Sequence, residues 1–305
     1  MLWTGNYGIL NNCNFNNNTG AYGGGVHWGG TFGTIKDSTF THNTAINGGG
    51  LEVGGANGTL SDSTFTGNSG NSGAGIHWFG ADGIIKNITV TGNTANIQGG
   101  GTLFNGVNGI ITESNFINNT SRGNGGGLEV GGASITVKDS CFTYNNANNA
   151  GAGVHWWGAN GKLTDCTFND NNANKIGGGI HWSGTSGTLK DSTFAHNIAN
   201  DGGGIHWIGE NNYLTGCTFT DNTATQLGGG IYLLNIGLII NSSFINSKSH
   251  KSNGIFANSD LTINGGKGIV YILIDNILSG ISIVVLNNET YYYPPNTNIN
   301  LPNKE

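Results

Sequence analysis

Residues 178–197 read GGIHWSGTSGTLKDSTFAHN, and residues 203–222 read GGIHWIGENNYLTGCTFTDN. Both stretches begin with a glycine pair and Ile-His-Trp, and both end with a phenylalanine followed three residues later by an asparagine. The second stretch starts about 25 residues after the first, a period within the range of known solenoid repeats. Self-similarity at a short fixed period indicates one structural unit stacked many times, because a unit of this length cannot bury its apolar side alone.

The same pattern extends over most of the chain in four recurring positions. An aromatic position recurs about every 25 residues and holds Phe15, Phe40, Phe65, Val90, Phe116, Phe142, Phe168, Phe194, Phe219 and Phe244. Asparagine follows three residues later at Asn18, Asn43, Asn68, Asn93, Asn119, Asn145, Asn171, Asn197 and Asn222. An apolar residue stands five residues before the aromatic position, at Leu10, Ile35, Leu60, Ile85, Ile111, Val137, Leu163, Leu189, Leu214 and Ile239. Glycine-rich segments precede Val26, Leu51, Ile76, Thr102, Leu128, Val154, Ile180, Ile205 and Ile231.

The segment between the apolar and aromatic positions has the periodicity of β-strands. In LKDSTF, residues 189–194, alternation places Leu189 and Phe194 inside, provided that the chain bends at Asp191. Strands of successive repeats would stack about 4.8 Å apart and share hydrogen bonds. The sequence therefore predicts an all-β fold, a right-handed parallel β-helix (a solenoid) of about ten rungs with 25–26 residues per rung. A rung is one turn of the solenoid.

Asparagine and glycine are expected at the corners of each rung. The recurring asparagine fits an inward ladder whose amides bond the amides above and below, and we expect its backbone to be left-handed. Glycine suits another corner because it lacks a Cβ and adopts left-handed conformations freely.

The repeat pattern also predicts the domain organisation. We expect one repeat domain over residues 1–264, which starts within a rung because Trp3 precedes Trp28 by one period of about 25 residues. Residues 265–305 lose the period and contain all three prolines of the chain. We expect a β-rich cap or the start of a next module there, together with a linker.

Composition narrows the class of partner. The chain has 305 residues, 56 of them glycine, and only 9% are charged, whereas about a quarter are charged in a typical globular chain. The net charge is 11 − 17 = −6 and Arg122 is the only arginine, so we expect no nucleic-acid partner. No cationic stretch leads into an apolar one after Met1, so we expect no signal peptide in this chain. Asp275 and Asn276 interrupt the most apolar segment, residues 268–286, so we expect no membrane span.

One column is rich in histidine and reads His27, Glu52, His77, Leu103, Glu129, His155, His181, His206 and Tyr232. By strand parity these side chains point outward, and we expect them to be solvated. Four successive rungs carry weak candidates for a site that binds zinc or a similar ion: Glu129, His155, His181 and His206. The three histidines are also candidate ligand-binding residues. Alternatively, the column is a duplicated surface position, since LEVGGA recurs at Leu51 and Leu128. On that interpretation the protein has no metal and no cofactor.

The next column is rich in tryptophan and reads Trp28, Val53, Trp78, Phe104, Val130, Trp156, Trp182, Trp207 and Leu233. It shares parity with the position two residues earlier, so we expect these side chains in the core. A changed register at the glycine corner would instead make them an exposed platform for sugar rings. Trp157 directly follows Trp156, so we expect its ring to face outward and identify it as a candidate for stacking on a ligand.

Three other patterns have ordinary explanations. An acidic column, interleaved with lysines, favours solvated corner residues over a row of calcium ligands: Asp37, Asp62, Glu113, Asp139, Asp165 and Asp191, with Lys36, Lys86, Lys138 and Lys190. Threonines flank many of the aromatic residues, but interruptions such as Asn115 and Ala195 disfavour an ice-binding array. Inward cysteines are expected at Cys13, Cys166 and Cys217 and an outward one at Cys141, with no pair placed for a disulfide.

Two motifs together resemble known repeats. The GGGI glycine corner and the F-x-x-N elements FTHN, FAHN and FTDN are similar to the repeats of chlamydial polymorphic outer-membrane proteins and of methanogen adhesin-like proteins. The resemblance covers residues 1 to about 260 and owes its specificity to repetition. It implies a right-handed β-helix displayed extracellularly or on a cell surface for attachment. This chain departs from the chlamydial pattern because no barrel or anchor is visible in it.

These observations favour a non-catalytic, adhesin-like stalk whose partner is a cell-surface glycan or protein. Catalytic sites on such solenoids concentrate unlike residues, such as paired carboxylates, at one rung inside a cleft. Here the rungs keep a nearly constant length, so no long loop is expected to wall a cleft, and the acids are spread along a column. A polysaccharide lyase or hydrolase is the alternative function, and a metal-binding or ice-binding surface is a minor one.

Overall fold

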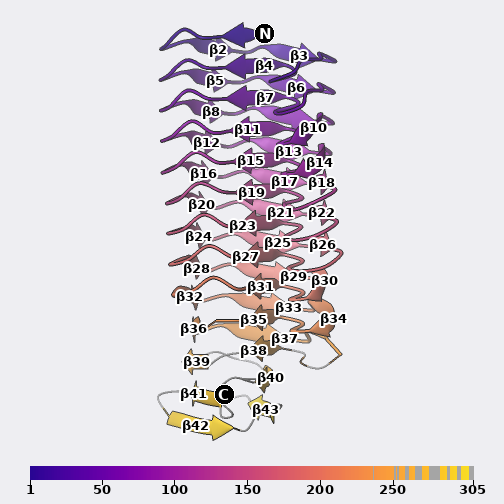
Figure 1. Cartoon of the computed structure of the whole chain (residues 1–305), viewed down its shortest axis with the longest axis vertical. Coiled ribbons are helices and arrows are strands. Elements are labelled where there is room, and N and C mark those ends of the chain that lie inside the picture. Colours follow the sequence, from indigo (N-terminus) through magenta and orange to yellow (C-terminus); the bar gives the residue numbers. More distant parts are fainter. Residues whose placement is uncertain are drawn as a thin grey trace.

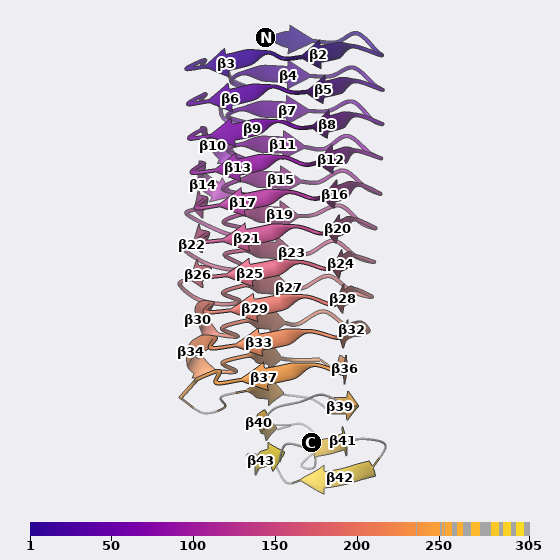
Figure 2. The same ribbon diagram turned by 180° about the vertical axis from the view of Figure 1, so that it is seen from behind.

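The structure is a computed structural model that describes residues 1–235, 237–250, 252, 254–257, 261–264, 270–274, 282–286, 289–293 and 297–301. Within these residues the regular structure consists of short β-strands, without a helix. The strands run across the long axis of a tall stack, as Figure 1 and Figure 2 show from opposite sides. The predicted all-β, right-handed parallel β-helix of about ten rungs is confirmed.

Sheets A and B each contain one strand from every rung, and the C-terminal strands extend both sheets. Sheet A contains, in spatial order, β1 (Leu2–Trp3), β4 (Val26–Trp28), β7 (Leu51–Val53), β11 (Ile76–Trp78), β15 (Thr102–Phe104), β19 (Leu128–Val130), β23 (Val154–Trp156), β27 (Ile180–Trp182), β31 (Ile205–Trp207), β35 (Ile231–Leu233), β38 (Ile255–Ala257), β40 (Val270–Ile274) and β43 (Thr297–Leu301). Sheet B contains β2 (Ile9–Asn11), β5 (Thr34–Lys36), β8 (Thr59–Ser61), β12 (Ile84–Lys86), β16 (Ile110–Thr112), β20 (Thr136–Lys138), β24 (Lys162–Thr164), β28 (Thr188–Lys190), β32 (Asn212–Thr215), β36 (Gly237–Ile240), β39 (Leu261–Asn264), β41 (Ser282–Leu286) and β42 (Glu289–Tyr293).

Two shorter sheets complete the solenoid. Sheet C contains β3 (Asn14–Asn16), β6 (Thr39–Thr41), β9 (Thr64–Thr66), β13 (Thr89–Thr91), β17 (Asn115–Ile117), β21 (Cys141–Thr143), β25 (Thr167–Asn169), β29 (Thr193–Ala195), β33 (Thr218–Thr220) and β37 (Ser243–Ile245). Sheet D contains β10 (Ser69–Ser72), β14 (Thr94–Gln98), β18 (Thr120–Ser121), β22 (Asn146–Ala147), β26 (Asn172–Ala173), β30 (Ile198–Asp201) and β34 (Thr223–Leu227).

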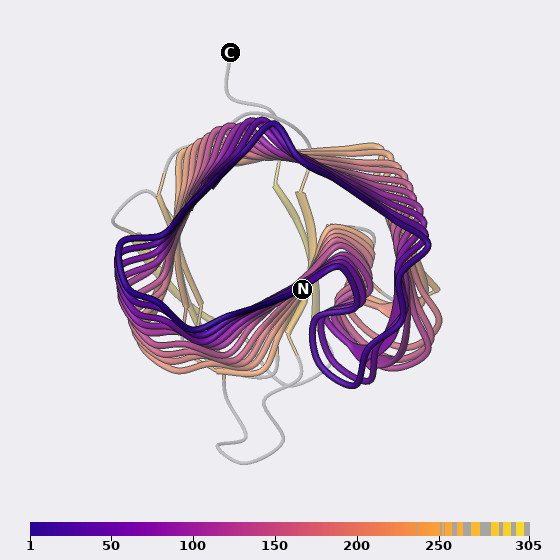
Figure 3. The ribbon, with the colours of Figure 1, turned by 90° about the horizontal axis from the view of Figure 1, so that it is seen from above.

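The hydrophobic core fills the space between sheets A, B and C, which form a tube when seen from above (Figure 3). The phenylalanine column forms one interior line, as predicted, because parallel pairing aligns equivalent residues such as Phe116 and Phe142. Stacked phenylalanine rings lie with their centroids 4.5 to 5.0 Å apart. Offset ring stacking adds to the apolar burial that stabilises each rung on the next.

The recurring asparagines form the predicted inward ladder. Asn43 donates from its backbone N–H and from Nδ2 to Asn68 Oδ1, at 2.9 and 3.0 Å, and Nδ2 also donates to the Phe15 carbonyl at 2.9 Å. The amide-to-amide bonds continue from Asn18 to Asn222. The ladder therefore satisfies buried polar groups that the tight corner would otherwise leave without partners.

The expected left-handed backbone at the ladder asparagines is wrong. The left-handed residue is the one before, for example His42 with φ 51° before Asn43. That residue turns the chain and keeps its own side chain exposed, so the asparagine can direct its amide inward. The expected bend at Asp191 is confirmed, with φ 47°. Aspartate suits this corner because it tolerates left-handed backbone better than most side chains.

The last strands depart from the parallel pattern. β40 and β41 pair in parallel with β38 and β39, whereas β43 and β42 pair antiparallel with β40 and β41. The expected domain boundary after residue 264 and the expected linker involve residues 265–269 and 294–296, which lie outside the described residues.

Candidate functional site

Sheet D forms a side lobe on the solenoid. Figure 3 shows the chain passing from sheet C into a loop outside the tube and then returning to the start of sheet A. We define the side lobe as sheet D and the glycine-rich return that follows each of its strands. The lobe has its own small core of Ala147, Ala152, Ala173 and Ala199. In the return, a Cβ on Gly177 would overlap the Ile180 carbonyl, so glycine allows the lobe to pack directly against sheet A.

The histidine-rich column lies on the outward face of sheet A and is named here the outer column. Parallel register places its members in one line: His27, Glu52, His77, Leu103, Glu129, His155, His181, His206, Tyr232 and Phe256. The expectation that these side chains are solvated is wrong. Glu52 and Glu129 are 3% and 2% exposed, and His181 is 7% exposed. Strand parity does direct them away from the main core, but the side lobe packs beside them.

The first part of the outer column is a carboxylate shared by two imidazoles. His27 Nδ1 lies 2.9 Å from Glu52 Oε2, and His77 Nδ1 lies 3.1 Å from Glu52 Oε1. Each ring nitrogen that carries a proton donates to the carboxylate oxygen facing it, so both oxygens of the buried group are satisfied. Consecutive rungs place His, Glu and His at strand spacing. This cluster was not predicted from the sequence, although the order of the three residues in the column could have indicated it.

The later part of the outer column is a stack of rings. His155 and His181 lie with centroids 5.0 Å apart and planes 9° apart, and His206 stacks on Tyr232 at 4.5 Å. Neither ring nitrogen of His181 has a hydrogen-bond partner among the described residues. Glu129 Oε1 lies 3.2 Å from His155 Nδ1, but the geometry is not that of a hydrogen bond. These imidazoles are therefore buried without the partners that His27 and His77 have.

Burial is the main cause of the shifted pKa values in this stack. It holds the pKa of His181 well below the usual histidine value, with further contributions from the neighbouring His155 and His206. Burial also lowers the pKa of His206 to about 4. Both rings are therefore neutral at pH 7, because the charged form loses its hydration inside the protein.

The weak metal candidates are not brought together as a ligand set. Parallel stacking of His155 and His181 points the in-plane nitrogen lone pairs along separate directions instead of toward one point. The described residues contain no group of three or more His, Cys, Asp or Glu side chains that is arranged to hold a metal ion.

The predicted burial of the tryptophan column is confirmed. Trp28, Trp78, Trp156 and Trp182 are fully buried, and each donates its Nε1 hydrogen to a carbonyl two residues later. The alternative of an exposed tryptophan platform in this column is wrong, because the glycine corner keeps the register.

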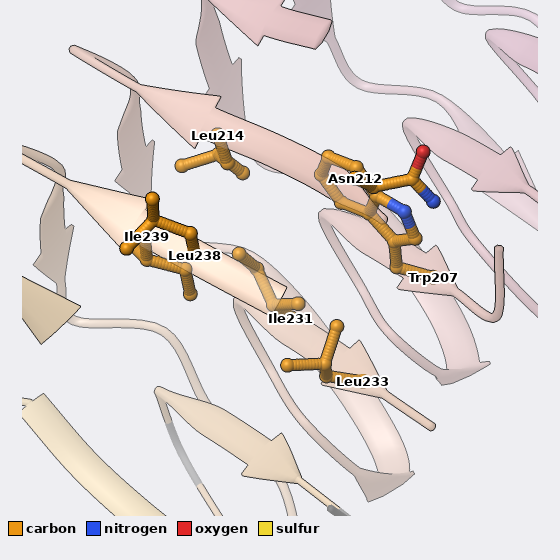
Figure 4. Close-up of a pocket in the computed structure, with 7 residues that line it drawn as sticks. All are labelled: Trp207, Asn212, Leu214, Ile231, Leu233, Leu238 and Ile239. Atoms are coloured by element: carbon orange, nitrogen blue, oxygen red, sulfur yellow. The ribbon is translucent and has the colours of Figure 1, made fainter. Parts of the chain in front are cut away.

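Trp207 differs from the other tryptophans because Asn212 replaces a glycine. At the equivalent positions of earlier rungs a Cβ on Gly33 or Gly187 would overlap the indole ring. The Asn212 amide instead accepts from Gly187 N–H at 2.6 Å and donates to the Gly184 carbonyl at 3.1 Å. Trp207 Nε1 is left without a partner among the described residues, beside an apolar cavity of about 10 Å³ (Figure 4).

Trp157 faces outward, as predicted, and is 50% exposed. Its indole lies over Gly131 of the preceding rung, where any Cβ would overlap the ring, and Asn105 Oδ1 lies against the same glycine. Asn105 Oδ1 has no hydrogen-bond partner among the described residues. Ser183 occupies the same position on the following rung. We call Asn105, Gly131, Trp157 and Ser183 the Trp157 platform; the sequence indicated its ring, but not its neighbours.

The remaining patterns match their ordinary explanations. Exposed lysines pair with acidic neighbours, as in Lys138 with Asp139 at 3.2 Å and Lys190 with Asp191 at 3.1 Å. Cys166 and Cys217 are buried, Cys141 is exposed, and all four cysteines are free. Burial raises the pKa of the Cys166 and Cys217 thiols to about 12, so neither is a reactive thiolate.

A surface depression of about 470 Å³ lies at the first rung. It is lined mainly by small and apolar residues, with His27 as its one histidine: Met1, Leu2, Thr19, Gly20, Ala21, Tyr22, Gly23, Gly24 and His27. No carboxylate lines this depression, so it does not have the paired acids of a glycosidase site.

The comparisons with known proteins agree with the architecture. Comparison with curated proteins and with solved structures found no match. The described part of the chain contains no helix with the length and apolar character needed to cross a membrane. A family model described as a right-handed β-helix region matches residues 1–164 and 152–290. Since these matches cover most of the chain, the protein belongs to the right-handed β-helix region family.

Proposed function

We propose that this chain is a non-catalytic, adhesin-like stalk, displayed extracellularly or on a cell surface, that attaches to cells through a surface glycan or protein. The proposal rests on the β-helix architecture and on the similarity of its repeats to chlamydial polymorphic outer-membrane proteins and methanogen adhesin-like proteins. A stack of rungs presents equivalent side chains at regular intervals along a rod. Many weak contacts of one kind then add to a usable affinity.

The Trp157 platform is the observation that carries the proposal. A half-exposed indole that lies against a glycine offers apolar ring surface, and such surface stacks well on the apolar face of a sugar ring. Ser183 supplies a hydroxyl on the following rung, and Asn105, two rungs before Trp157, holds its buried Oδ1 against Gly131. A small number of polar groups beside an aromatic surface is the usual means by which a protein orients a small ligand.

A second aromatic ring repeats this arrangement. Phe79 is 46% exposed and lies over Gly54, as Trp157 lies over Gly131. The strands that precede these two rings, β11 and β23, are three strands apart in sheet A, which corresponds to about 14 Å along the rod. Two platforms on one face allow a single glycan chain or a clustered surface to make two contacts.

The arrangement of the acidic side chains supports the non-catalytic part of the proposal. The acids of the corner column are exposed and separated by lysines, and the buried acids Glu52 and Glu129 lie behind the side lobe. General acid and base catalysis needs such groups around one substrate position.

A glycan array and a cell-binding assay with the full chain test this function. We expect binding that falls roughly tenfold in Trp157→Ala, and less in Phe79→Ala because phenylalanine offers a smaller face. Tyr144→Ala is the matched control, since Tyr144 is an equally exposed ring outside either platform. Reducing-sugar and unsaturated-product assays on a polysaccharide panel accompany it. Turnover that is lost on mutation of one acid would replace the adhesin proposal with the lyase or hydrolase alternative.

A further inference from the structure

We propose that His155, His181 and His206 form an acid-sensitive latch, over which the side lobe closes while the rings are neutral and from which it opens locally when they are protonated. The latch is independent of any glycan partner. It concerns only the outer column and the lobe beside it.

The geometry of the stack makes protonation incompatible with closure. The rings of His155 and His206 lie on either side of His181, with centroids 5.0 and 5.1 Å from it. Two cations at that separation repel each other strongly in a poorly hydrated site. His181 has no acceptor for a second N–H, because neither of its nitrogens has a partner among the described residues. Protonated rings therefore gain hydration and separation only when the lobe moves away.

Few other charged groups face these rings. On the outer column the titratable groups beside the stack are Glu129, which lies 3.2 Å from His155, and Tyr232, whose ring stacks on His206. On the lobe strands and returns of the same rungs, the charged residues are Lys175, which is exposed, and Asp201, which is half-buried. Arg122 is exposed on the lobe one rung before that of His155. Among the described residues of the outer column, Glu129 is the carboxyl group beside the stack, and it lies next to the first ring, His155.

The histidines and Asp201 respond to acid with opposite signs. A histidine whose pKa is lower in the folded than in the unfolded chain takes up protons on opening, so acid favours the open lobe between pH 6.5 and the folded pKa. For His206, with a pKa of about 4 when buried, this shifts the opening equilibrium at pH 5 by more than about tenfold. Burial raises the pKa of Asp201, so its protonation favours the closed lobe. The histidines therefore drive the opening.

Hydrogen exchange followed by mass spectrometry on the full chain tests the latch. Amide protection, corrected for the intrinsic exchange rate, is compared at pH 7.5 and pH 5.0 in residues 198–204 and in residues 69–75. The second segment is the internal control, because its rung carries His77 beside the Glu52 carboxylate. We expect protection of residues 198–204 to fall more than about tenfold on acidification, with a much smaller change in residues 69–75.

Variants identify the groups responsible. His181→Phe and His206→Tyr continue the aromatic stack that Tyr232 and Phe256 already form, and each should remove much of the acid-induced loss of protection. Asp201→Asn keeps the oxygen that accepts the Leu227 N–H and should retain the loss, as should His196→Gln at an exposed corner. An equal loss in both segments would overturn the latch. So would a loss that persists in His206→Tyr or disappears in Asp201→Asn.

Discussion

His77 and His181 occupy equivalent places on β11 and β27, each between an isoleucine and a tryptophan. His77 Nδ1 lies 3.1 Å from a carboxylate oxygen of Glu52, whereas both nitrogens of His181 lack partners among the described residues. The difference comes from the adjacent rung, which supplies glutamate to one ring and histidine to the other. In a solenoid, the residue one period away decides whether an imidazole on a covered face gains a hydrogen-bond partner or is buried without one.

Acidification should produce the largest difference between the two parts of the column. The stability due to the neutral His206 is fully present above about pH 6.5 and declines as pH falls toward its folded pKa of about 4. The loss is on the order of 3 kcal/mol for this residue. Denaturant unfolding of the native chain and of His206→Phe, at pH 7.5 and pH 4.5, measures it. Identical pH dependence in both proteins would show that His206 does not contribute.

Removal of the shared carboxylate should have the next largest effect. Glu52→Leu leaves two imidazoles without their acceptor, and we expect a loss of about 3 kcal/mol at pH 7.5, since one partner of a buried pair is removed. Glu129→Leu is the matched control because both residues lie in an LEVGGA segment. Glu129 makes no hydrogen bond to His155, so its replacement should change stability by less than about 1 kcal/mol. Equal losses in thermal unfolding would contradict the distinction.

Replacing His181 or His77 by phenylalanine should have a smaller effect on stability, and the two replacements should act in opposite directions. His181→Phe removes two buried nitrogens without partners and should stabilise the protein by about 1 kcal/mol at pH 7.5. His77→Phe leaves Glu52 Oε1 without its donor and should destabilise the protein by about 1–2 kcal/mol. Chemical denaturation at constant pH measures both changes. Destabilisation by His181→Phe would mean that the ring is too large for the stack.

The smallest expected effect is the coupling between the two parts. Glu52 and His181 lie on β7 and β27, five strands apart in sheet A, or about 24 Å at strand spacing. The changes caused by Glu52→Leu and His181→Phe should therefore add to within about 0.5 kcal/mol in the double variant. A larger coupling energy from this cycle would show that the outer column acts as one unit.

The sequence predicted those features that depend on one rung and its repetition. Alternation and period were sufficient for the interior line of phenylalanines, for the buried tryptophans and for the outward Trp157. The ladder asparagines were also predicted, but their backbone conformation was not, because the residue before each one, such as His42, makes the turn.

The burial of the outer column could not be predicted from alternation. Parity identifies the face of the sheet on which His181 lies, but not the segment that packs over that face. The covering side lobe comes from another part of the rung, and its return path depends on left-handed glycines such as Gly177. The contacts of Trp157 with Gly131, and of Trp207 with Asn212, likewise depend on residues from neighbouring rungs or from an irregular corner.

The asparagine ladder also determines how the rod carries load. Strands lie across the long axis, so the hydrogen bonds between rungs run along it, and tension applied at the two ends acts on the interfaces in series. The weakest interface then sets the breaking force of the whole molecule.

Each interface from Asn18 to Asn222 adds the amide-to-amide bond of the ladder. The series stops at Ser247, whose hydroxyl has no partner among the described residues. Under tension, the rungs after Asn222 should separate first and leave the earlier ones intact.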